Sequence, residues 1–431
     1  MTSDSRLLSA HEASRLIAAG DLTSEALVSS CLERISARES QVQAWAWIDE
    51  DKALEEAKER DRQRPLSPLH GIPVGVKDII DTAQIPTARG SAIYRDRVPN
   101  RDADCVASLR RAGAVILGKT VTTEFAASFP GPTRNPLNLN RTPGGSSSGS
   151  AAAVADWMVP LSIGSQTSGS IVRPASFCGV FGLKPTIGLW PTAGVQRLAP
   201  SLDTLGGFAR DYRDLSLLFP HMGGTVMSPS ARPGGDHVRI GFAQTPYWDE
   251  CDPGSASLLL EFLDSLLRSG VIDSEVELPG SFSDLAPAQL AIFGFESARE
   301  LDKEYTDHNA ELSDTLREWL ERSRAIPMVQ YREALELRMR AGLDMTQIWD
   351  SLDVLLTPAV KGEAPQSLSN TGDPLFCRAW TALGGPALAL PLLKGPSCLP
   401  LGMQLVGPPG GEAKLFVAAK QLLERVATSN H

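Results

Sequence analysis

Residues 144–150 read GGSSSGS, and residues 165–185 read SQTSGSIVRPASFCGVFGLKP. Both stretches crowd glycine against serine, which is the usual composition of a flexible linker. Apolar runs of strand length, such as AVILGKT and VPLSIG, alternate with helical or Gly/Ser/Pro-rich segments between residues 71 and 206. This alternation predicts an α/β sheet flanked by helices. Composition alone leaves open whether the two Gly/Ser stretches are linkers or loops of that sheet.

The overall composition is that of a globular protein. The 431 residues are 42% hydrophobic and 21% charged, which is enough to bury a large core. The net charge is −10 and no block of Lys and Arg stands out, so we expect no nucleic-acid partner. The six cysteines form no CxxC pair and there is no HExxH motif, so we expect neither a disulfide framework, nor a metal, nor another cofactor.

No apolar run reaches the length of about 18 residues that a membrane span needs. The N-terminal residues also lack the apolar centre of a signal peptide. We therefore expect a cytoplasmic protein with no membrane partner.

The order of predicted elements suggests a single domain over residues 1–431. It would begin with a helical part (1–64), continue with an α/β core (65–235), and contain a mainly helical part (255–350) that shapes the substrate site. Strands and a last helix (351–431) would complete the core. Because strands from both ends fit one sheet, we favour one domain with a helical insertion. Residues 235–245, GDHVRIGFAQT, read as a further strand.

Residues 113–120, GAVILGKT, satisfy the nucleotide-binding pattern GxxxxGK[ST]. A phosphate-binding loop follows a strand, whereas Ala, Val, Ile and Leu here are the residues of a strand itself. We expect a buried strand with Lys119 on the surface at its end, and keep nucleotide binding as the alternative from another functional class. GSSSG (145–149) satisfies the serine-hydrolase pattern GxSxG, but residues before it read as a loop and not as the strand that pattern requires.

Lys77 interrupts a run that is otherwise largely apolar, in GIPVGVKDIID. Such a lysine either extends its amine to water from an edge strand or is held in the core. Neutralising a lysine at pH 7 costs about 4.6 kcal/mol, which burial or a nearby positive charge would have to offset. The product would be a general base, and a Ser-Lys pair can replace a Ser-His pair.

These residues carry a resemblance to a known family. The chain resembles the amidase signature family over most of residues 5–425, through six blocks in the family's order. The blocks are HGIPVGVKD (70–78), DADCVASLRRAGAVILGKTVTTEFA (102–126), RNPLNLNRTPGGSSSGSAAAVA (134–155), GSQTSGSIVRPASFCGVFGLKPT (164–186), SLDTLGGFAR (201–210), and LGGPALALPL with LPLGMQLVGPP (383–409).

The resemblance implies the amidase signature fold, with N-terminal helices and a large mixed central β-sheet flanked by helices on both faces. It implies a Ser-cisSer-Lys triad that cleaves linear carboxamides through an acyl-enzyme. Ser170 falls at the nucleophile, Ser146 at the bridging serine whose preceding peptide is cis, and Lys77 at the base. The backbone N–H groups of Thr167, Ser168, Gly169 and Ser170 would form the oxyanion hole.

We assign four residues near these loops to substrate binding: Arg173, Gln166, Phe129 and Ser147. Arg173 lies in GSIVRP, a sequence similar to that of malonamidase-like members in which an arginine holds a substrate carboxylate. A small amide bearing a carboxylate is therefore one substrate class, and a structural role for Arg173 is the alternative. Gln166 replaces an aspartate of many family members, and a hydrogen bond that orders the loop is its alternative role.

The expected partner is a small-molecule amide. A second function in the same fold is the amide-cleaving component of a glutamine-dependent tRNA amidotransferase, which would need partner chains. The sequence does not fix the oligomeric state, and a homodimer is compatible with it.

Overall fold

Residues 4–127, 129–222 and 238–429 are described in the structure, which is a computed structural model. Their strands form one 11-stranded sheet in the order β1-β3-β2-β4-β6-β5-β10-β11-β9-β7-β8. The strands are β1 (Trp45–Ile48), β2 (Pro73–Lys77), β3 (Val115–Thr120), β4 (Leu161–Gln166), β5 (Phe181–Lys184), β6 (Thr204–Ala209), β7 (Ile240–Phe242), β8 (Ser274–Glu275), β9 (Val354–Pro358), β10 (Ala387–Lys394) and β11 (Pro400–Val406).

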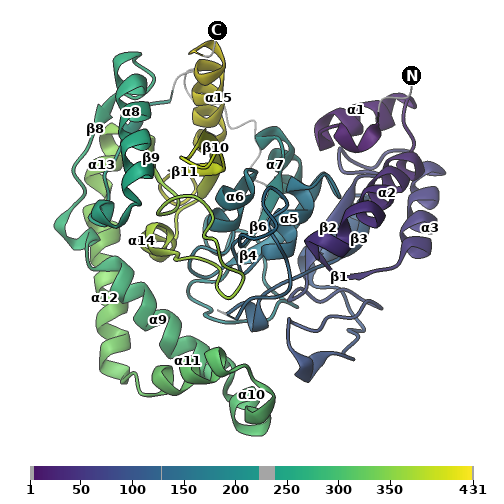
Figure 1. The fold of residues 1–431 in the computed structure, drawn as a ribbon, viewed down its shortest axis with the longest axis horizontal. Helices are drawn as coiled ribbons and strands as arrows, with labels where there is room; N and C mark the ends of the chain where they lie inside the picture. The colour runs from purple at the N-terminus through teal and green to yellow at the C-terminus, as the bar shows by residue number, and fades with distance from the viewer. Residues whose placement is uncertain (1–3, 128, 223–237, 430–431) are drawn as a thin grey trace.

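Helices surround this sheet in the described part of the chain (Figure 1). They are α1 (Ala10–Ala19), α2 (Ser24–Val42), α3 (Glu50–Asp61), α4 (Asp104–Arg111), α5 (Ser148–Ala155), α6 (Val172–Cys178), α7 (Tyr212–Leu218), α8 (Pro253–Arg268), α9 (Leu285–Glu300), α10 (Asp302–Asp307), α11 (Asp314–Arg324), α12 (Met328–Asp344), α13 (Thr346–Ser351), α14 (Leu375–Leu383) and α15 (Glu412–Ser429).

Both faces of the sheet are buried under helices. In β3, Ile116 belongs to one core cluster, with residues of α1, α4, α7, α8 and α15. Val115 and Leu117 belong to the other, with residues of α2, α3, α5, α6 and α14. Since successive side chains of a strand point to opposite faces, the two clusters lie on opposite sides of the sheet. The predicted fold class, a large mixed sheet with helices on both faces, is confirmed.

Parallel pairing brings the ends of three strands to one edge of the sheet. β2 pairs in parallel with β3 and β4, with Lys77 opposite Thr120 and Val76 opposite Ile163. Lys77 at the end of β2 therefore lies close to the end of β4 and to the loop that leaves it. Val76 packs in the cluster with α4, so alternation turns the Lys77 side chain toward the face covered by α5.

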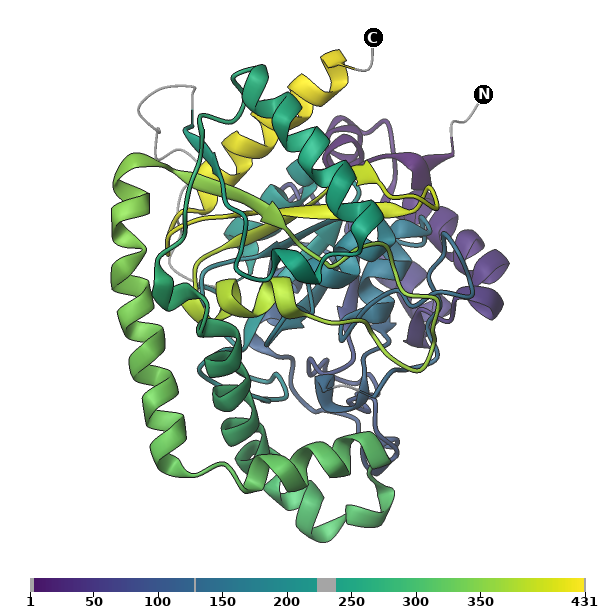
Figure 2. The same ribbon diagram turned by 60° about the vertical axis from the view of Figure 1, so that its left-hand side comes forward.

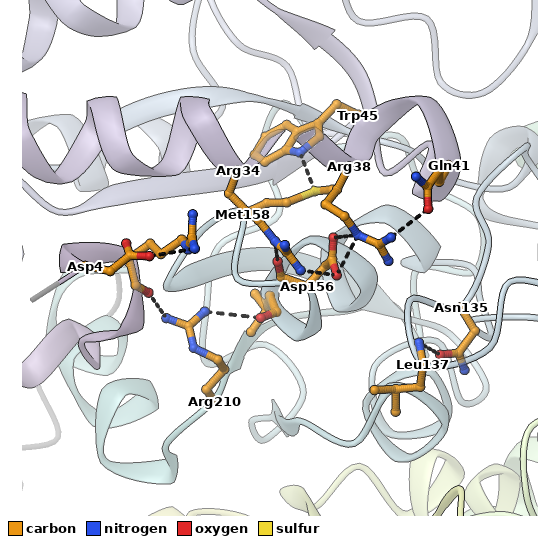
Figure 3. A network of polar contacts seen from close by, with 12 residues as sticks. Asp4, Arg34, Arg38, Gln41, Trp45, Asn135, Leu137, Asp156, Met158 and Arg210 are labelled. Carbon is orange, nitrogen blue, oxygen red and sulfur yellow. Dashed lines mark hydrogen bonds and ion pairs between the residues drawn. The ribbon is translucent and has the colours of Figure 1, made fainter. Parts of the chain in front are cut away.

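The N-terminal helices are tied to the end of α5. Arg34 of α2 donates to the carbonyl and the carboxylate of Asp156, at 2.8 and 2.9 Å, and Arg38 pairs with the same carboxylate at 3.1 Å (Figure 3). The indole N–H of Trp45 in β1 points at Met158 Sδ, 3.4 Å away. Because α5 begins at Ser148, inside the GGSSSGS segment, these contacts help to fix the position of that segment.

Helices α9 to α12 extend away from the sheet at the bottom of both views (Figures 1 and 2). They belong to the segment predicted as mainly helical, in which the structure adds a short strand, β8, that the sequence did not predict. The predicted strand at 235–245 is observed at Ile240–Phe242, whereas residues 235–237, which include the predicted core boundary, lie outside the described residues.

The expected surface position of Lys119 is wrong. The GAVILGKT segment does form a strand, β3, but Lys119 is completely buried. Its Nζ donates to Thr87 Oγ1 (2.7 Å) and to the Ile80 carbonyl (2.8 Å), and forms an ion pair with Asp78 Oδ1 (3.2 Å). The sequence pattern missed this because the partner carboxylate comes from the end of the neighbouring strand β2.

Across the described ranges, no helix combines the length and the apolar character that a bilayer crossing requires.

Candidate active site

Lys77 is buried at the end of β2 beside two serine hydroxyls. Its Nζ lies 2.7 Å from Ser146 Oγ and 2.9 Å from Ser165 Oγ, both within hydrogen-bond distance. Burial lowers the pKa of Lys77 well below its usual value, and the negative charge of Asp203 opposes this effect only in part. A lowered pKa favours the neutral amine, which is the form that can accept a proton.

Ser165 was not singled out in the sequence. It lies in β4, where Ser162 and Ser165 interrupt an apolar run, and the parallel pairing of β2 with β4 brings it to Lys77. The register between two strands cannot be read from either strand alone, so the sequence held no signal for this contact. Ser165 and Asp203 also line a pocket of about 320 Å³.

Ser146 reaches Lys77 from the GGSSSGS turn. The peptide between Gly145 and Ser146 is cis, as expected from the resemblance, and Gly144 has a φ of 83°. A Cβ atom at Gly145 would lie 2.7 Å from Thr371 Cγ2, so a larger residue would clash there. The Ser146 carbonyl accepts a hydrogen bond from the Thr123 N–H at 3.2 Å, which holds the turn against the segment after β3.

Ser170 lies in the loop between β4 and α6 and lines a pocket of about 360 Å³. In the described part of the chain its hydroxyl has no hydrogen-bond partner, so the structure does not join it to Ser146. The backbone N–H groups of residues 167–170 likewise donate to no described acceptor. The next two N–H groups, of Ile171 and Val172, both donate to Gln166 Oε1, at 2.8 and 3.0 Å. Consecutive free N–H groups beside a free hydroxyl are suited to binding an oxyanion.

Side chains from helices α9 and α14 donate hydrogen bonds to the carbonyl groups of this loop. Gln289 of α9 donates to the Thr167 carbonyl (3.0 Å) and to Ser168 Oγ (2.8 Å). Thr381 of α14 donates to the Ser168 carbonyl (2.6 Å) and accepts from Gln166 Nε2 (2.9 Å). With their carbonyl groups fixed in this way, the peptide units have little freedom to rotate their N–H groups. Gln289 and Thr381 come from segments outside the recognised glycine-serine blocks, so sequence reasoning did not single them out.

Replacing Gln289 by leucine is expected to lower kcat of the activity proposed below by about 10-fold with little change in KM, because a mobile loop stabilises an oxyanion less well. Steady-state kinetics on purified variants would measure the effect. Gln404→Leu is a matched control, since Gln404 is also buried and donates through Nε2 to two carbonyls, at 2.9 Å each, in another part of the sheet. An equal loss of kcat in both variants would contradict a specific role for Gln289.

Arg173 is buried beside the same pocket. Its Nη1 donates to the Gly372 carbonyl (2.9 Å), and its Nη2 donates to the Gly145 carbonyl (2.7 Å) and to Thr371 Oγ1 (3.1 Å). Its Nε is buried without a partner among the described residues. Burial lowers the pKa of Arg173 to about 10, so the guanidinium remains charged at neutral pH.

Three other residues assigned to substrate binding lie in different settings. Gln166 has both polar ends of its side chain occupied by the loop and by Thr381. Ser147 is fully buried and exchanges hydrogen bonds with the backbone of Ser165, accepting at 3.3 Å and donating at 3.1 Å. Phe129 is 45% exposed in the loop after Glu124. The hydrogen bonds of Gln166 and Ser147 favour an ordering role in the loops, and their contact with substrate stays a prediction.

Comparison with known proteins identifies the family of this chain. The family model described as Amidase matches residues 26–416. The A component of a glutamyl-tRNA(Gln) amidotransferase from Anaeromyxobacter sp. (strain K) is 34% identical, over 96% of this chain and 95% of the relative.

Two solved structures are also similar. A native peptide amidase from Stenotrophomonas maltophilia is 30% identical, with a TM-score of 0.83 over 98% of this chain and 97% of the other. Another, described as an amidase, is 30% identical with a TM-score of 0.86, over 97% of this chain and 100% of the other.

Proposed function

The chain belongs to the amidase family of amide-hydrolysing enzymes, and we propose that it cleaves a linear carboxamide to a carboxylate and ammonia or an amine. The observation that carries this proposal is the contact of 2.7 Å between Lys77 Nζ and Ser146 Oγ, made by a buried amine with a lowered pKa. Ser170, free of hydrogen bonds to described residues, lines the adjacent pocket and supplies the nucleophile.

In the proposed reaction, Ser170 Oγ bonds to the carbonyl carbon while its proton passes through Ser146 to Lys77. The N–H groups of residues 167–170 hold the negative oxygen that forms. Collapse of this intermediate breaks the C–N bond, and the proton returns from Lys77 through Ser146 to the leaving nitrogen. Water then attacks the acyl-enzyme with Lys77 as base, releasing the acid and restoring Ser170.

The pocket favours a substrate with a negative charge. Two arginines, Arg173 and Arg378, line it together with Ser170, and Asp373 is the single carboxylate among its lining residues. Charged groups that line a partly desolvated pocket select ligands of opposite charge. We therefore include small amides that carry a carboxylate among the substrates.

A second candidate function is favoured by the curated relatives, which include the tRNA amidotransferase component from Anaeromyxobacter. The chain would then release ammonia from glutamine for a tRNA-dependent reaction that needs partner chains. A partner that co-purifies with the chain, together with hydrolysis of glutamine and no other amide, would favour this function over an independent amidase.

The experiment that tests the main proposal is ammonia or amine release by the purified protein from a panel of acidic, aliphatic, aryl and ureido amides. Turnover of at least one carboxamide other than glutamine, without any added partner, is the expected result. Absence of turnover across the whole panel would overturn the proposal.

The pH dependence of kcat/KM tests the role of Lys77. Lys77 accepts a proton only when neutral, so activity is present above its pKa and is lost as the pH falls through that pKa. The Asp203 carboxylate, whose own pKa burial raises to about 6, stabilises the charged form of Lys77. Asp203→Asn is therefore expected to lower the pKa of Lys77 and to move the acid limb of the profile to lower pH.

Asp214→Asn is the control for this profile. Burial also raises the pKa of Asp214 to about 6, and its carboxylate accepts hydrogen bonds from the N–H groups of Ala10 and His11, away from Lys77. The control is expected to leave the acid limb in place. A limb that stays fixed or moves to higher pH in Asp203→Asn would contradict the assignment of Lys77.

A further inference from the structure

We propose that Arg378 is the carboxylate receptor of the Ser170 pocket, and that the preferred substrates are monoamides of dicarboxylic acids. This inference rests on the proposed amide hydrolysis, and it names both the residue that selects the substrate and the substrate class. Arg378 lies in α14, outside the glycine-serine loops that carry the family resemblance.

The guanidinium of Arg378 is free to bind a ligand. Its nitrogens donate to no residue in the described part of the chain, and Nε is buried without a partner. The only ion pair that it forms among the described residues is with Asp373 Oδ1, 3.9 Å from Nη2, which is too long for a hydrogen bond. Leaving a buried charged donor unpaired is costly, so the pocket is suited to an anion that completes its hydrogen bonds.

Asp373 does not neutralise Arg378 because it is held elsewhere. Its Oδ1 accepts from the Leu375 N–H at 3.0 Å, and its Oδ2 pairs with Lys361 at 3.1 Å. Lys361 also pairs with Glu250 at 2.9 Å, so this lysine lies between two carboxylates. Because Asp373 is 3.9 Å from Arg378 and makes no hydrogen bond to it, the donors of Arg378 remain available to the pocket.

Arg173, by contrast, has both terminal nitrogens occupied. They hold Gly372, Thr371 and the Gly145 carbonyl, which belongs to the peptide before Ser146. A substrate carboxylate that displaced these contacts would release the turn that carries Ser146. We therefore assign Arg173 to positioning the catalytic turn and adding positive charge, and Arg378 to direct contact with the carboxylate.

The apolar wall of the pocket indicates what part of the substrate joins the carboxylate to the amide. Leu290, Phe293 and Trp319 line it, and the rings of Phe293 and Trp319 stack with centroids 4.8 Å apart. An apolar wall beside a guanidinium fits a short hydrocarbon stem that ends in a carboxylate. The amide at the other end of the stem would then face Ser170.

The test compares two variants on matched substrates. Values of kcat/KM are measured for malonamate, succinamate and glutaramate and for the neutral amides propanamide, butanamide and pentanamide. Arg378→Gln is expected to lower kcat/KM for the acidic series by about 30-fold, mainly through KM, and to change the neutral series by less than about 3-fold. Arg378→Lys should restore part of the loss, whereas Arg173→Gln should reduce both series alike.

Two further measurements keep the outcome decisive. Arg332→Gln removes the same charge from an exposed position on α12 and should change neither series. Calorimetric titration with succinate reports on the subsite without any turnover, and Arg378→Gln should weaken succinate binding by about 30-fold.

Succinate binding that depends on Arg378 in a protein without amidase activity would refute the proposed function and support the subsite. Amidase activity with equal losses in both series for Arg378→Gln would support the function and overturn the subsite. Failure of the wild type to bind succinate, or binding unaffected by Arg378→Gln, would also overturn the subsite.

Discussion

Replacing Ser170 by alanine, or Lys77 by methionine, is expected to lower kcat/KM for amide hydrolysis by at least about 10³-fold. Alanine at position 170 removes the attacking oxygen. Methionine at position 77 fills a similar volume in a completely buried site. It has no amine to accept the proton of Ser146, whose Oγ lies 2.7 Å from Lys77 Nζ in the wild type. Because these residues act in one proton path, the double variant should lose little more activity than either single variant.

Matched controls distinguish a loss of catalytic activity from a loss of folding. Ser176→Ala removes a buried hydroxyl from α6 that bonds, among the described residues, only to the Val172 carbonyl, at 2.8 Å. Lys184→Met removes another buried lysine, whose pKa burial lowers to about 7. Both controls are expected to retain most of the activity. Circular dichroism and thermal melting would verify folding, and a folded Ser170→Ala protein with near wild-type turnover would refute the mechanism.

Replacing Lys119 by methionine is expected to lower the free energy of unfolding by about 3–5 kcal/mol, the usual cost of removing one partner from a buried ion pair. The change leaves the Asp78 carboxylate, 3.2 Å from Lys119 Nζ, without its cation in the interior. Burial already raises the pKa of Asp78. Equilibrium unfolding in urea, followed by fluorescence, would measure the loss.

Two comparisons test the cause of that loss. Adding Asp78→Asn to Lys119→Met removes the stranded charge and should recover part of the stability. Lys58→Met disrupts an exposed pair with Glu25, 3.4 Å apart, and should cost no more than about 1 kcal/mol. A Lys119→Met protein as stable as the Lys58→Met protein would show that the buried pair contributes little.

Strands and helices were predictable where apolar residues form continuous runs. VPLSIG and PALALPLL read as strands and form β4 and β10. The capping box at the start of α1 joins Ser9 to Glu12, which is only three residues away. These elements depend on neighbours in the sequence, which is why sequence reasoning reaches them.

Contacts between distant segments were predictable only through the family resemblance. That resemblance placed Lys77 with Ser146, and the structure shows the two side chains in contact. It offered nothing for Ser165, whose position depends on strand register, or for Gln289 and Arg378, which lie in helices of ordinary amphipathic pattern. Lys119 was misplaced because a charged residue near a strand end is usually exposed, and its buried partner is 41 positions away in the chain.

The order of strands also has a consequence for biosynthesis. β10 pairs with β5 on one side and with β11 on the other, and β11 in turn pairs with β9. Among the described strands, the row formed by β1 to β6 and the row formed by β7, β8 and β9 are thus joined only by the β10–β11 hairpin, which is made near the end of translation. Until residues 387–406 have left the ribosome, both rows present an unpaired edge, and such edges are where nascent chains associate wrongly. Chaperone binding during synthesis would protect this protein at that stage.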